Sequence, residues 1–472
     1  MSTSLLWFRR DLRLTDNVAL HAARASSERV FAVYCTAELE RLNARQHSFV
    51  SGSLQMLRAT LDKHDATLTI ADGTQPHALI ETARRLGASA VHCSRTYARA
   101  DRVGEEQARA ALQRDGIELH VHRGDMIHEP QATAELKQAP GDGYRVFPPY
   151  LAAWRSLDPA LPVAQTLPNG RDERPGPIPE SGTATVPAPG ETAASAALDK
   201  FTTARAADYA VNAPYPARDG TSNLAPYLRF GCISPRVVYQ TLARRMSWSW
   251  TLASERASMS LFVRQLALRD FFTQLAYFVP ALHDDALQEK MRSFPWSEDR
   301  AHLEAWREGR TGYPLVDAAM RQLRAQGLVH QRAAICAASF CCFDLGLDWR
   351  LGRRVWMEEH VAADDALCDG NWQWLAGVGP DQAAYPRIYN PEKQARQFDA
   401  QAVYVRHWVP ELKKLPTSAA LAPWRVDHQH QIELGFFTPK QYPRPIVDRE
   451  KTAREFLARY RAFASEPART KH

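Results

Sequence analysis

Two hydroxyl side chains follow a glycine just before a predicted helix, in residues 219–228 (DGTSNLAPYL). Thr221 and Ser222 supply the hydroxyls, and a helix start also presents backbone N–H groups without partners. Such a start is suited to an anion such as a phosphate. Because Ser and Thr cap many helices that bind nothing, this segment taken alone more often indicates a simple cap.

A second candidate is the stretch Asn371-Trp372-Gln373-Trp374. Two indoles that lie two positions apart on a helix point to different sides, so one could face a cofactor and the other a ligand. The alternative, two aromatic core residues, is favoured by this pattern alone. Tryptophan is concentrated in the second half of the chain, since ten of the twelve lie at or after Trp248.

The composition is that of a folded chain. A length of 472 residues predicts two or three domains, and 45% hydrophobic with 24% charged residues excludes a mainly disordered protein. No apolar run approaches the roughly 18 residues of a membrane helix. The apolar run at residues 5–8 (LLWF) is only four residues long, because Arg9 and Arg10 follow it directly. We therefore expect no membrane span, no signal peptide and a cytoplasmic protein.

The seven cysteines are scattered, without a C-x-x-C pair. This spacing gives no zinc or iron–sulfur site, so we expect reduced, mostly buried thiols and no metal. The formal charge of +6 is compatible with a nucleic-acid partner, but residues 440–472 carry nine Lys or Arg and only four Asp or Glu. Most of the excess charge is in that tail, so it does not locate a binding groove.

The elements that must position these residues change in type along the chain. Buried strands alternate with helical patterns, such as residues 53–63 and 77–86, in the first part. The predicted strands are residues 4–8, 30–35, 67–71, 90–93 and 117–121. This alternation predicts an α/β, Rossmann-like, doubly wound parallel sheet, here without the G-x-G-x-x-G motif of a dinucleotide site.

The second half is predicted to be all-α. Apolar residues recur at helical spacing in residues 254–277, 314–326, 332–345 and 452–462. Before it, eight of the thirty prolines fall in residues 158–189, which indicates a linker or a long surface crossing. The predicted domains are an α/β domain at residues 1–128, a linker at 129–195 and a large helical domain at 196–472.

Several motifs, taken in order along the chain, resemble those of the photolyase/cryptochrome family of flavoproteins. They are residues 7–14 (WFRRDLRL) with Asp16-Asn17, 144–150 (YRVFPPY), 220–228, 231–236 (GCISPR), 311–321 and 371–374. Each motif is modest, but the ordered set is specific and covers nearly the whole chain. It is most similar to class I cyclobutane pyrimidine dimer photolyases with a divergent active site.

The resemblance implies FAD, folded into the helical domain. The implied cofactor-binding positions are Tyr209, Thr221, Ser222, Asn223, Leu224, Ala225, Phe262, Gln265, Arg269, Ala362, Asp364 and Cys368. Ala225 replaces the family's usual Ser. Ala100 and Asp101 stand where a folate-type antenna expects Asn and Glu, so the antenna chromophore is left unassigned.

The positions beside the flavin depart from the family together. Ala334 and Ala362 replace an Arg–Asp pair, and replacing both members of a buried pair can be nearly neutral where losing one costs about 3–5 kcal/mol. Cys368 matches the residue that faces the flavin's reactive nitrogen, which implies an effect on the stable redox state. Its alternative is a small buried hydrophobe.

The resemblance also implies an electron route. Trp296, Trp349 and Trp372 match the three tryptophans that pass an electron from the surface to the photo-excited flavin. With Gln265 and Cys368 they form the implied catalytic set. Three core aromatics remain the alternative.

The implied DNA-lesion pocket departs from the family. Trp374 matches one of two tryptophans that pack the flipped pyrimidine dimer, but Leu268 stands at the other, a loss of about 1–3 kcal/mol of stacking. Gln265 replaces a Glu that hydrogen-bonds the dimer, and Ala213 replaces a DNA-contacting Arg. The implied DNA-binding residues are Gln265, Leu268, Gln331, Arg332 and Trp374.

A different lesion class is disfavoured. Enzymes for (6-4) photoproducts carry a His pair, and here His330 is flanked by Gln331, with Ile335 at the other family position.

The resemblance therefore predicts a deoxyribodipyrimidine photo-lyase, in which light drives FAD-dependent splitting of cyclobutane dimers in UV-damaged DNA, acting as a monomer. The alternative is a cryptochrome-like blue-light receptor that keeps flavin and tryptophan chain and signals to an unknown partner. Leu268, Gln265, Ala213 and Cys368 favour that alternative. A third hypothesis is a flavin-dependent DNA binder without repair.

Overall fold

A computed structural model describes residues 2–137, 142–380 and 386–465. The chain packs into two compact units. Unit 1 comprises Met1–Ala210, Thr221–Pro280 and Val361–Ala366, and unit 2 comprises Val211–Gly220, Ala281–His360 and Leu367–His472. Helical residues after position 195 thus pack with the α/β region in unit 1. The boundaries at residues 128 and 195 follow element type rather than packing, and they stay predictions.

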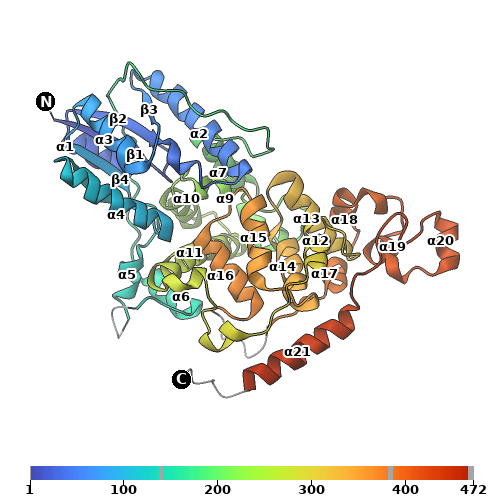
Figure 1. Ribbon diagram of the computed structural model, residues 1–472. Helices are drawn as coiled ribbons and strands as arrows, with labels where there is room; N and C mark the ends of the chain where they lie inside the picture. The colour runs from blue at the N-terminus through green and yellow to red at the C-terminus, as the bar shows by residue number, and fades with distance from the viewer. Residues whose placement is uncertain (1, 138–141, 381–385, 466–472) are drawn as a thin grey trace. The chain divides into compact units, whose positions relative to one another are not determined.

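The core of unit 1 is a five-stranded parallel sheet in the order β3-β2-β1-β4-β5 (Figure 1). Its strands are β1 (Thr3–Phe8), β2 (Arg29–Cys35), β3 (Leu68–Ala71), β4 (Ala90–Ser94) and β5 (Glu118–His122). Central strands such as β1 (TSLLWF) are buried along their whole length because helices cover both faces. The predicted doubly wound parallel sheet is confirmed.

Helices of the α/β region connect these strands. They are α1 (Val18–Ser26), α2 (Ala44–Asp62), α3 (Gln75–Leu86) and α4 (Arg99–Arg114). Helix α2 begins well before the predicted residue 53, at the N-cap Asn43, whose side chain forms a capping box with Gln46. This half buries Phe49 and Val50, but polar residues such as Ser48 and Ser51 are buried with them, so no apolar residue recurs every three or four positions there. Gly52 belongs there too, since a Cβ on it would lie 2.7 Å from Pro189.

The proline-rich stretch is a surface crossing and not a free linker. Residues 157–190 contain no helix or strand, but backbone bonds tie them to the sheet, including Thr67 N–H to Gly170 O (3.2 Å) and Ile70 N–H to Pro175 O (2.6 Å). Asp172 accepts from Thr69 (2.7 Å). The rest of the predicted linker is partly helical, with α5 (Pro130–Ala134), α6 (Phe147–Ser156) and the start of α7 (Glu191–Ala204).

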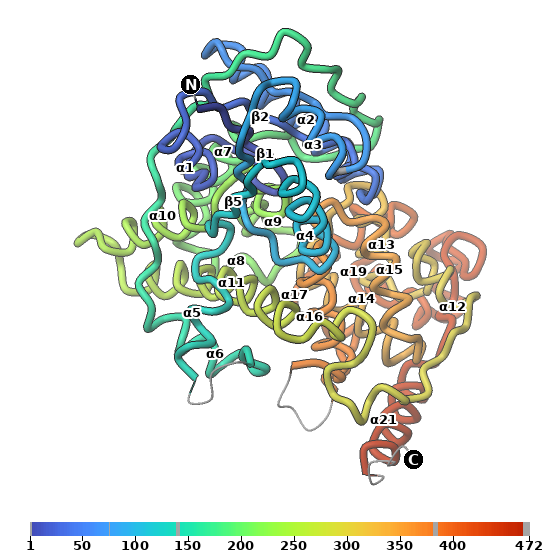
Figure 2. Tube along the Cα trace, turned by 60° about the vertical axis from the view of Figure 1, so that its left-hand side comes forward, coloured from blue at the N-terminus to red at the C-terminus, as the bar shows by residue number. Residues whose placement is uncertain are grey.

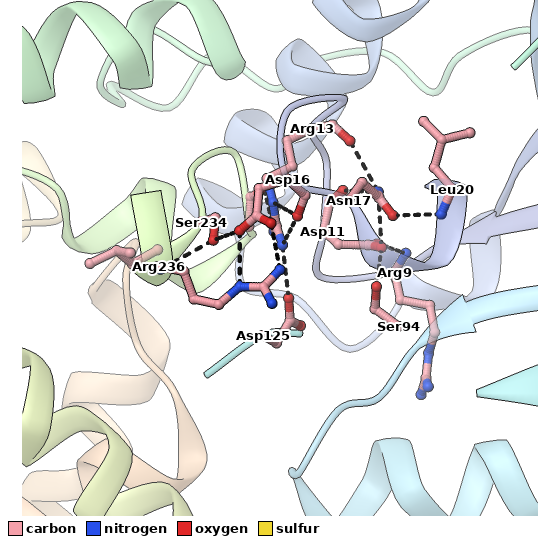
Figure 3. A network of polar contacts seen from close by, with 12 residues as sticks. Arg9, Asp11, Arg13, Asp16, Asn17, Leu20, Ser94, Asp125, Ser234 and Arg236 are labelled. Carbon is pink, nitrogen blue, oxygen red and sulfur yellow. Dashed lines mark hydrogen bonds and ion pairs between the residues drawn. The ribbon is translucent and has the colours of Figure 1, made fainter. Parts of the chain in front are cut away.

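A buried ionic network joins the loop after β1 to later helices of unit 1 (Figure 3). Asp16 is fully buried at a positive φ of 54° and pairs with Arg236, and it also accepts from Ser234 Oγ and from the Val163 N–H (2.8 Å). Arg13 donates to Gly231 O (3.1 Å). This network explains why helical residues 221–280 pack as one unit with the sheet.

The helices of the later chain follow the predicted all-α pattern. In unit 1 they are α9 (Ala225–Arg229), α10 (Pro235–Ser247) and α11 (Ala253–Phe278), and α8 (Tyr209–Asn212) precedes them. Unit 2 contains α12 (Arg300–Arg307), α13 (Pro314–Gln326), α14 (Gln331–Ser339), α15 (Trp349–Glu359), α17 (Pro391–Phe398), α18 (Val403–Trp408), α19 (Thr417–Leu421), α20 (His428–Leu434) and α21 (Arg449–Ser465). Helix α16 (Asp365–Ala376) begins in the short segment that belongs to unit 1.

Helix α13 packs against α14 and α18 within unit 2 (Figure 1). The α-helix predicted at residues 332–345 ends at Ser339, because Phe340–Asp344 form a buried π-helical turn. Within the described ranges, no helix is both long and apolar enough to cross a membrane.

Candidate functional site

The hydroxyl turn lies in unit 1, just before α9. Asn223 adopts a left-handed conformation (φ 57°), and Thr221 Oγ1 donates to its Oδ1 (3.2 Å). Ser222 Oγ accepts from the Leu224 N–H (3.3 Å), but its own proton has no acceptor among the described residues. Helix α9 has only five residues, so a helix dipole contributes little, and anion binding here would rest on hydroxyls and turn N–H groups.

An aromatic contact brings Tyr209 next to α11. The ring of Phe262 lies 5.4 Å from Tyr209 at an interplanar angle of 87°, and 4.5 Å from Phe201. Burial raises the pKa of Tyr209, so its hydroxyl stays protonated and can donate a hydrogen bond. Two of the implied flavin residues that are far apart in sequence are therefore neighbours.

Helix α11 presents several implied site residues together. Phe262, Gln265 and Arg269 are separated by three and four positions and share one face of the helix. The half-buried Gln265 carboxamide has no partner within the described ranges, whereas Arg269 donates to Asp125 O (3.3 Å) and Leu228 O (3.4 Å). Leu268 is also half-buried, one turn beyond Gln265. The face thus combines a free amide with an apolar neighbour.

The segment that carries Ala362 and Asp364 is anchored within unit 1. Asp364 pairs with Arg10 (3.1 Å) and Arg229 (3.5 Å), and Arg229 Nε donates to Ala363 O (2.7 Å). Burial and the positive charge of Arg10 lower the pKa of Arg229. Burial also opposes the charge of Arg10, but Asp101 and Asp364 outweigh it and raise the pKa of that guanidinium.

Asp101 is part of this ionic cluster. Its buried carboxylate pairs with Arg10 (2.7 Å) and Arg41 (3.2 Å). The sequence pointed to Asp101 only as an unusual antenna position and did not predict its bond to Arg10. No local sequence pattern could have predicted this ion pair, because the sheet brings Arg10 and Asp101 together from distant parts of the chain.

The tryptophans of the implied electron route lie in unit 2. Trp349 is fully buried, Trp372 is nearly so on α16, and Trp296 is half-buried against Phe294 (4.7 Å) and Phe456 (5.7 Å). Gly352 makes room for one of them, since a Cβ on it would lie 2.4 Å from the Trp372 indole. Trp372 therefore packs on α15 about one turn after Trp349.

Two further indoles next to Trp372 were not part of the predicted electron route. Trp356 stands two turns after Trp349 on the same face of α15, and its ring lies 5.7 Å from that of Trp372. Trp306 lies 6.3 Å from Trp372 and 6.4 Å from Trp356. Trp372 thus lies between Trp349 and Trp356 along α15. The seven-residue spacing of Trp349 and Trp356 was a usable signal.

The implied DNA-facing residues of unit 2 lie on α14 and α16. Trp374 is half-buried and Trp372 almost fully buried, as expected of side chains on different sides of a helix. Gln331 is exposed, and the Arg332 guanidinium lies 4.3 Å from the Phe398 ring centre. Cys368 is buried on α16, and Ala334 is half-buried on α14.

His330 caps α14 directly before these residues, and its Nδ1 accepts from the Arg332 N–H (3.2 Å). Burial, and secondarily Arg332, lowers its pKa to about 4. The unfolded chain binds this proton near pH 6.5 while the folded chain does not, so stability falls as pH drops from about 6.5 to 4.

His330→Asn should keep the cap and remove this titration. Between pH 7 and pH 5 the variant should lose about 2 kcal/mol less unfolding free energy than the wild type. Urea denaturation at several pH values would measure this, with the exposed His64→Asn as control. Parallel pH profiles for wild type and His330→Asn would contradict the assignment.

Two family models match this chain, one in its α/β part and one in its helical part. Residues 4–168 match the family model described as DNA photolyase, and residues 262–462 match the model described as the FAD binding domain of DNA photolyase. A deoxyribodipyrimidine photo-lyase of Synechococcus is 32% identical over 98% of this chain and 98% of its own length. Cryptochrome-2 of Arabidopsis thaliana is 32% identical over 97% of this chain and 78% of its own length.

A solved structure agrees with these matches. The bacterial class III photolyase from Agrobacterium tumefaciens superposes with a TM-score of 0.86 at 31% identity, over 99% of this chain and 98% of that one. The predicted fold and the predicted cofactor, FAD, are confirmed at the level of the family. The chain belongs to the DNA photolyase/cryptochrome family of FAD-binding proteins.

Proposed function

We propose that this protein is a deoxyribodipyrimidine photo-lyase, which uses light to split cyclobutane pyrimidine dimers in damaged DNA. The observation that carries the proposal is the face of α11, where the Gln265 carboxamide has no partner among the described residues and shares the helix with Phe262 and Arg269. Relatives that match nearly the whole chain at 32–33% identity bear the name of this enzyme, which supports it.

The residues present fit FAD and a DNA lesion. FAD, when bound, supplies light absorption and the transferred electron. Thr221 and Ser222, whose hydroxyl proton has no acceptor among the described residues, would bind its phosphates, and Tyr209 and Phe262 would line its pocket. The Gln265 amide of unit 1 would donate to a carbonyl of the extruded pyrimidine dimer. In unit 2, Trp374 and Arg332 are the proposed DNA-binding residues, because an indole can stack on a base and a guanidinium can pair with a phosphate.

A cryptochrome-like blue-light receptor is the second candidate, and Leu268 is the observation that favours it. An aliphatic side chain at that place offers no stacking face to a flipped base. The protein would then keep the flavin and the tryptophans but would lack substantial repair.

One assay decides between the two. Chemically reduced, FAD-loaded protein is illuminated with an oligonucleotide that contains one cyclobutane thymine dimer, and recovery of intact thymines is followed, with a dark sample as control. We expect light-dependent recovery over many turnovers. No recovery by protein that retains bound, reduced flavin would reject the repair function.

Leu268→Trp should tighten binding of the dimer-containing oligonucleotide about fivefold or more, because it adds a stacking face. The matched control is Leu261→Trp, two turns earlier on α11, where the parent leucine is 46% exposed. Equal affinities for wild type and Leu268→Trp would place Leu268 outside the lesion pocket.

A further inference from the structure

The connection between α10 and α11 exposes two tryptophans to solvent. Trp248 is 44% exposed, Trp250 is 73% exposed and the neighbouring Leu252 is 62% exposed. The two indoles contact each other, with ring centres 5.3 Å apart and planes inclined by 32°. In Figure 2 this connection lies at the left-hand margin, at the ends of the two helices. Exposed apolar patches of this kind usually mark binding sites.

The connection is held rigidly beneath the indoles. Arg256 of α11 donates to Met246 O (3.0 Å) and to Thr251 O, and the buried Thr251 hydroxyl donates to Arg245 O (2.7 Å). Glu255 accepts from the Leu252 N–H (2.9 Å) and caps the helix. A fixed turn displays the tryptophans, so little conformational entropy would be lost when a ligand binds them.

The guanidinium groups of two arginines near this turn are positively charged and are not engaged by other described residues. Arg244 is exposed and Arg245 half-buried at the end of α10, and neither guanidinium has a hydrogen bond or ion pair to any residue that the structure describes. Glu255, the single acidic residue in positions 235–256, is engaged by backbone N–H. We call Arg244, Arg245, Trp248 and Trp250 the indole–arginine surface.

We propose that the indole–arginine surface binds single-stranded nucleic acid, with bases stacked on the exposed indoles and phosphates paired with the two arginines. Aromatic faces beside unpaired guanidinium groups are the combination that sequence-tolerant strand binding requires. Positions 235–256 hold four arginines and one acidic residue, Glu255, and this net positive charge favours a polyanion over an apolar protein segment. Gln265 lies about 18 Å further along α11, so this site is separate from the lesion pocket.

The test uses FAD-loaded full-length protein in the dark with a fluorescein-labelled, undamaged oligothymidylate, so its outcome does not depend on repair. Trp248→Ala/Trp250→Ala should weaken binding about tenfold or more, as expected for the loss of base stacking. The matched control is Leu161→Ala, because Leu161 is an equally exposed (72%) apolar residue of unit 1. It should bind like the wild type.

The salt dependence of affinity and the self-association of the protein test the proposal further. Arg244→Ser/Arg245→Ser should flatten the dependence of affinity on salt concentration, because fewer counterions are released, whereas Arg155→Ser, at another exposed arginine, should not. Unchanged oligothymidylate affinity in the double Trp variant would overturn the proposal. A double Trp variant that instead loses self-association in sedimentation, with unaltered DNA binding, would assign the surface to a second copy of the chain and also overturn it.

Discussion

Trp372→Phe is expected to lower the rate of light-driven flavin reduction at least about tenfold. Trp372 packs at Gly352 on α15, about one turn after Trp349, and its ring contacts that of Trp356 (5.7 Å). A phenyl ring fills much of the space but is far harder to oxidise than an indole. The measurement is the loss of oxidised-flavin absorbance under blue light, with an external reductant and with the flavin content of each variant matched.

Single variants should then separate the two directions away from Trp372. The resemblance implies that the electron comes through Trp349 and Trp296, whereas the ring contacts add Trp356 and Trp306. If both directions operate, Trp349→Phe and Trp356→Phe should each retain part of the rate. Trp408→Phe, at a half-buried indole that contacts His407, is the control. An undiminished rate in Trp372→Phe would exclude this indole as an electron donor.

Asp16→Asn should destabilise the protein by about 3 kcal/mol, because it leaves the buried Arg236 guanidinium without its carboxylate. Asn tolerates the left-handed backbone at this position, so the effect reports the lost charge rather than strain. The free energy of unfolding from urea titrations measures it. Combining Asp16→Asn with Arg236→Met should restore much of the stability, since an apolar pair avoids the uncompensated charge.

The chain offers a matched control for this experiment. Asp65 also has a positive φ (55°) and also pairs with an arginine, Arg171, but the two side chains are 84% and 67% exposed. Asp65→Asn should therefore change the stability by less than about 1 kcal/mol. Equal losses at the two positions would show that burial of the Asp16–Arg236 pair does not determine its importance.

The strands and the main helices could be predicted because they depend on local residue patterns. A buried parallel strand requires a continuous apolar run, as in Val30–Cys35, and a helix that packs on one side requires apolar residues every three or four positions, as in α13. The first half of α2 escaped prediction for the same reason. Besides Phe49 and Val50, this half buries Ser48, Ser51 and Gly52, so apolar residues do not recur every three or four positions.

The sequence by itself determined the family, the cofactor and the type of each region, because ordered motifs and local periodicity are properties of the chain alone. Only the tertiary structure decided which residues meet. The Asp16–Arg236 pair, the bond of Asp101 to Arg10 and the packing of Trp372 between Trp349 and Trp356 all join segments distant in sequence. Such contacts follow from how elements pack, and no local pattern encodes them.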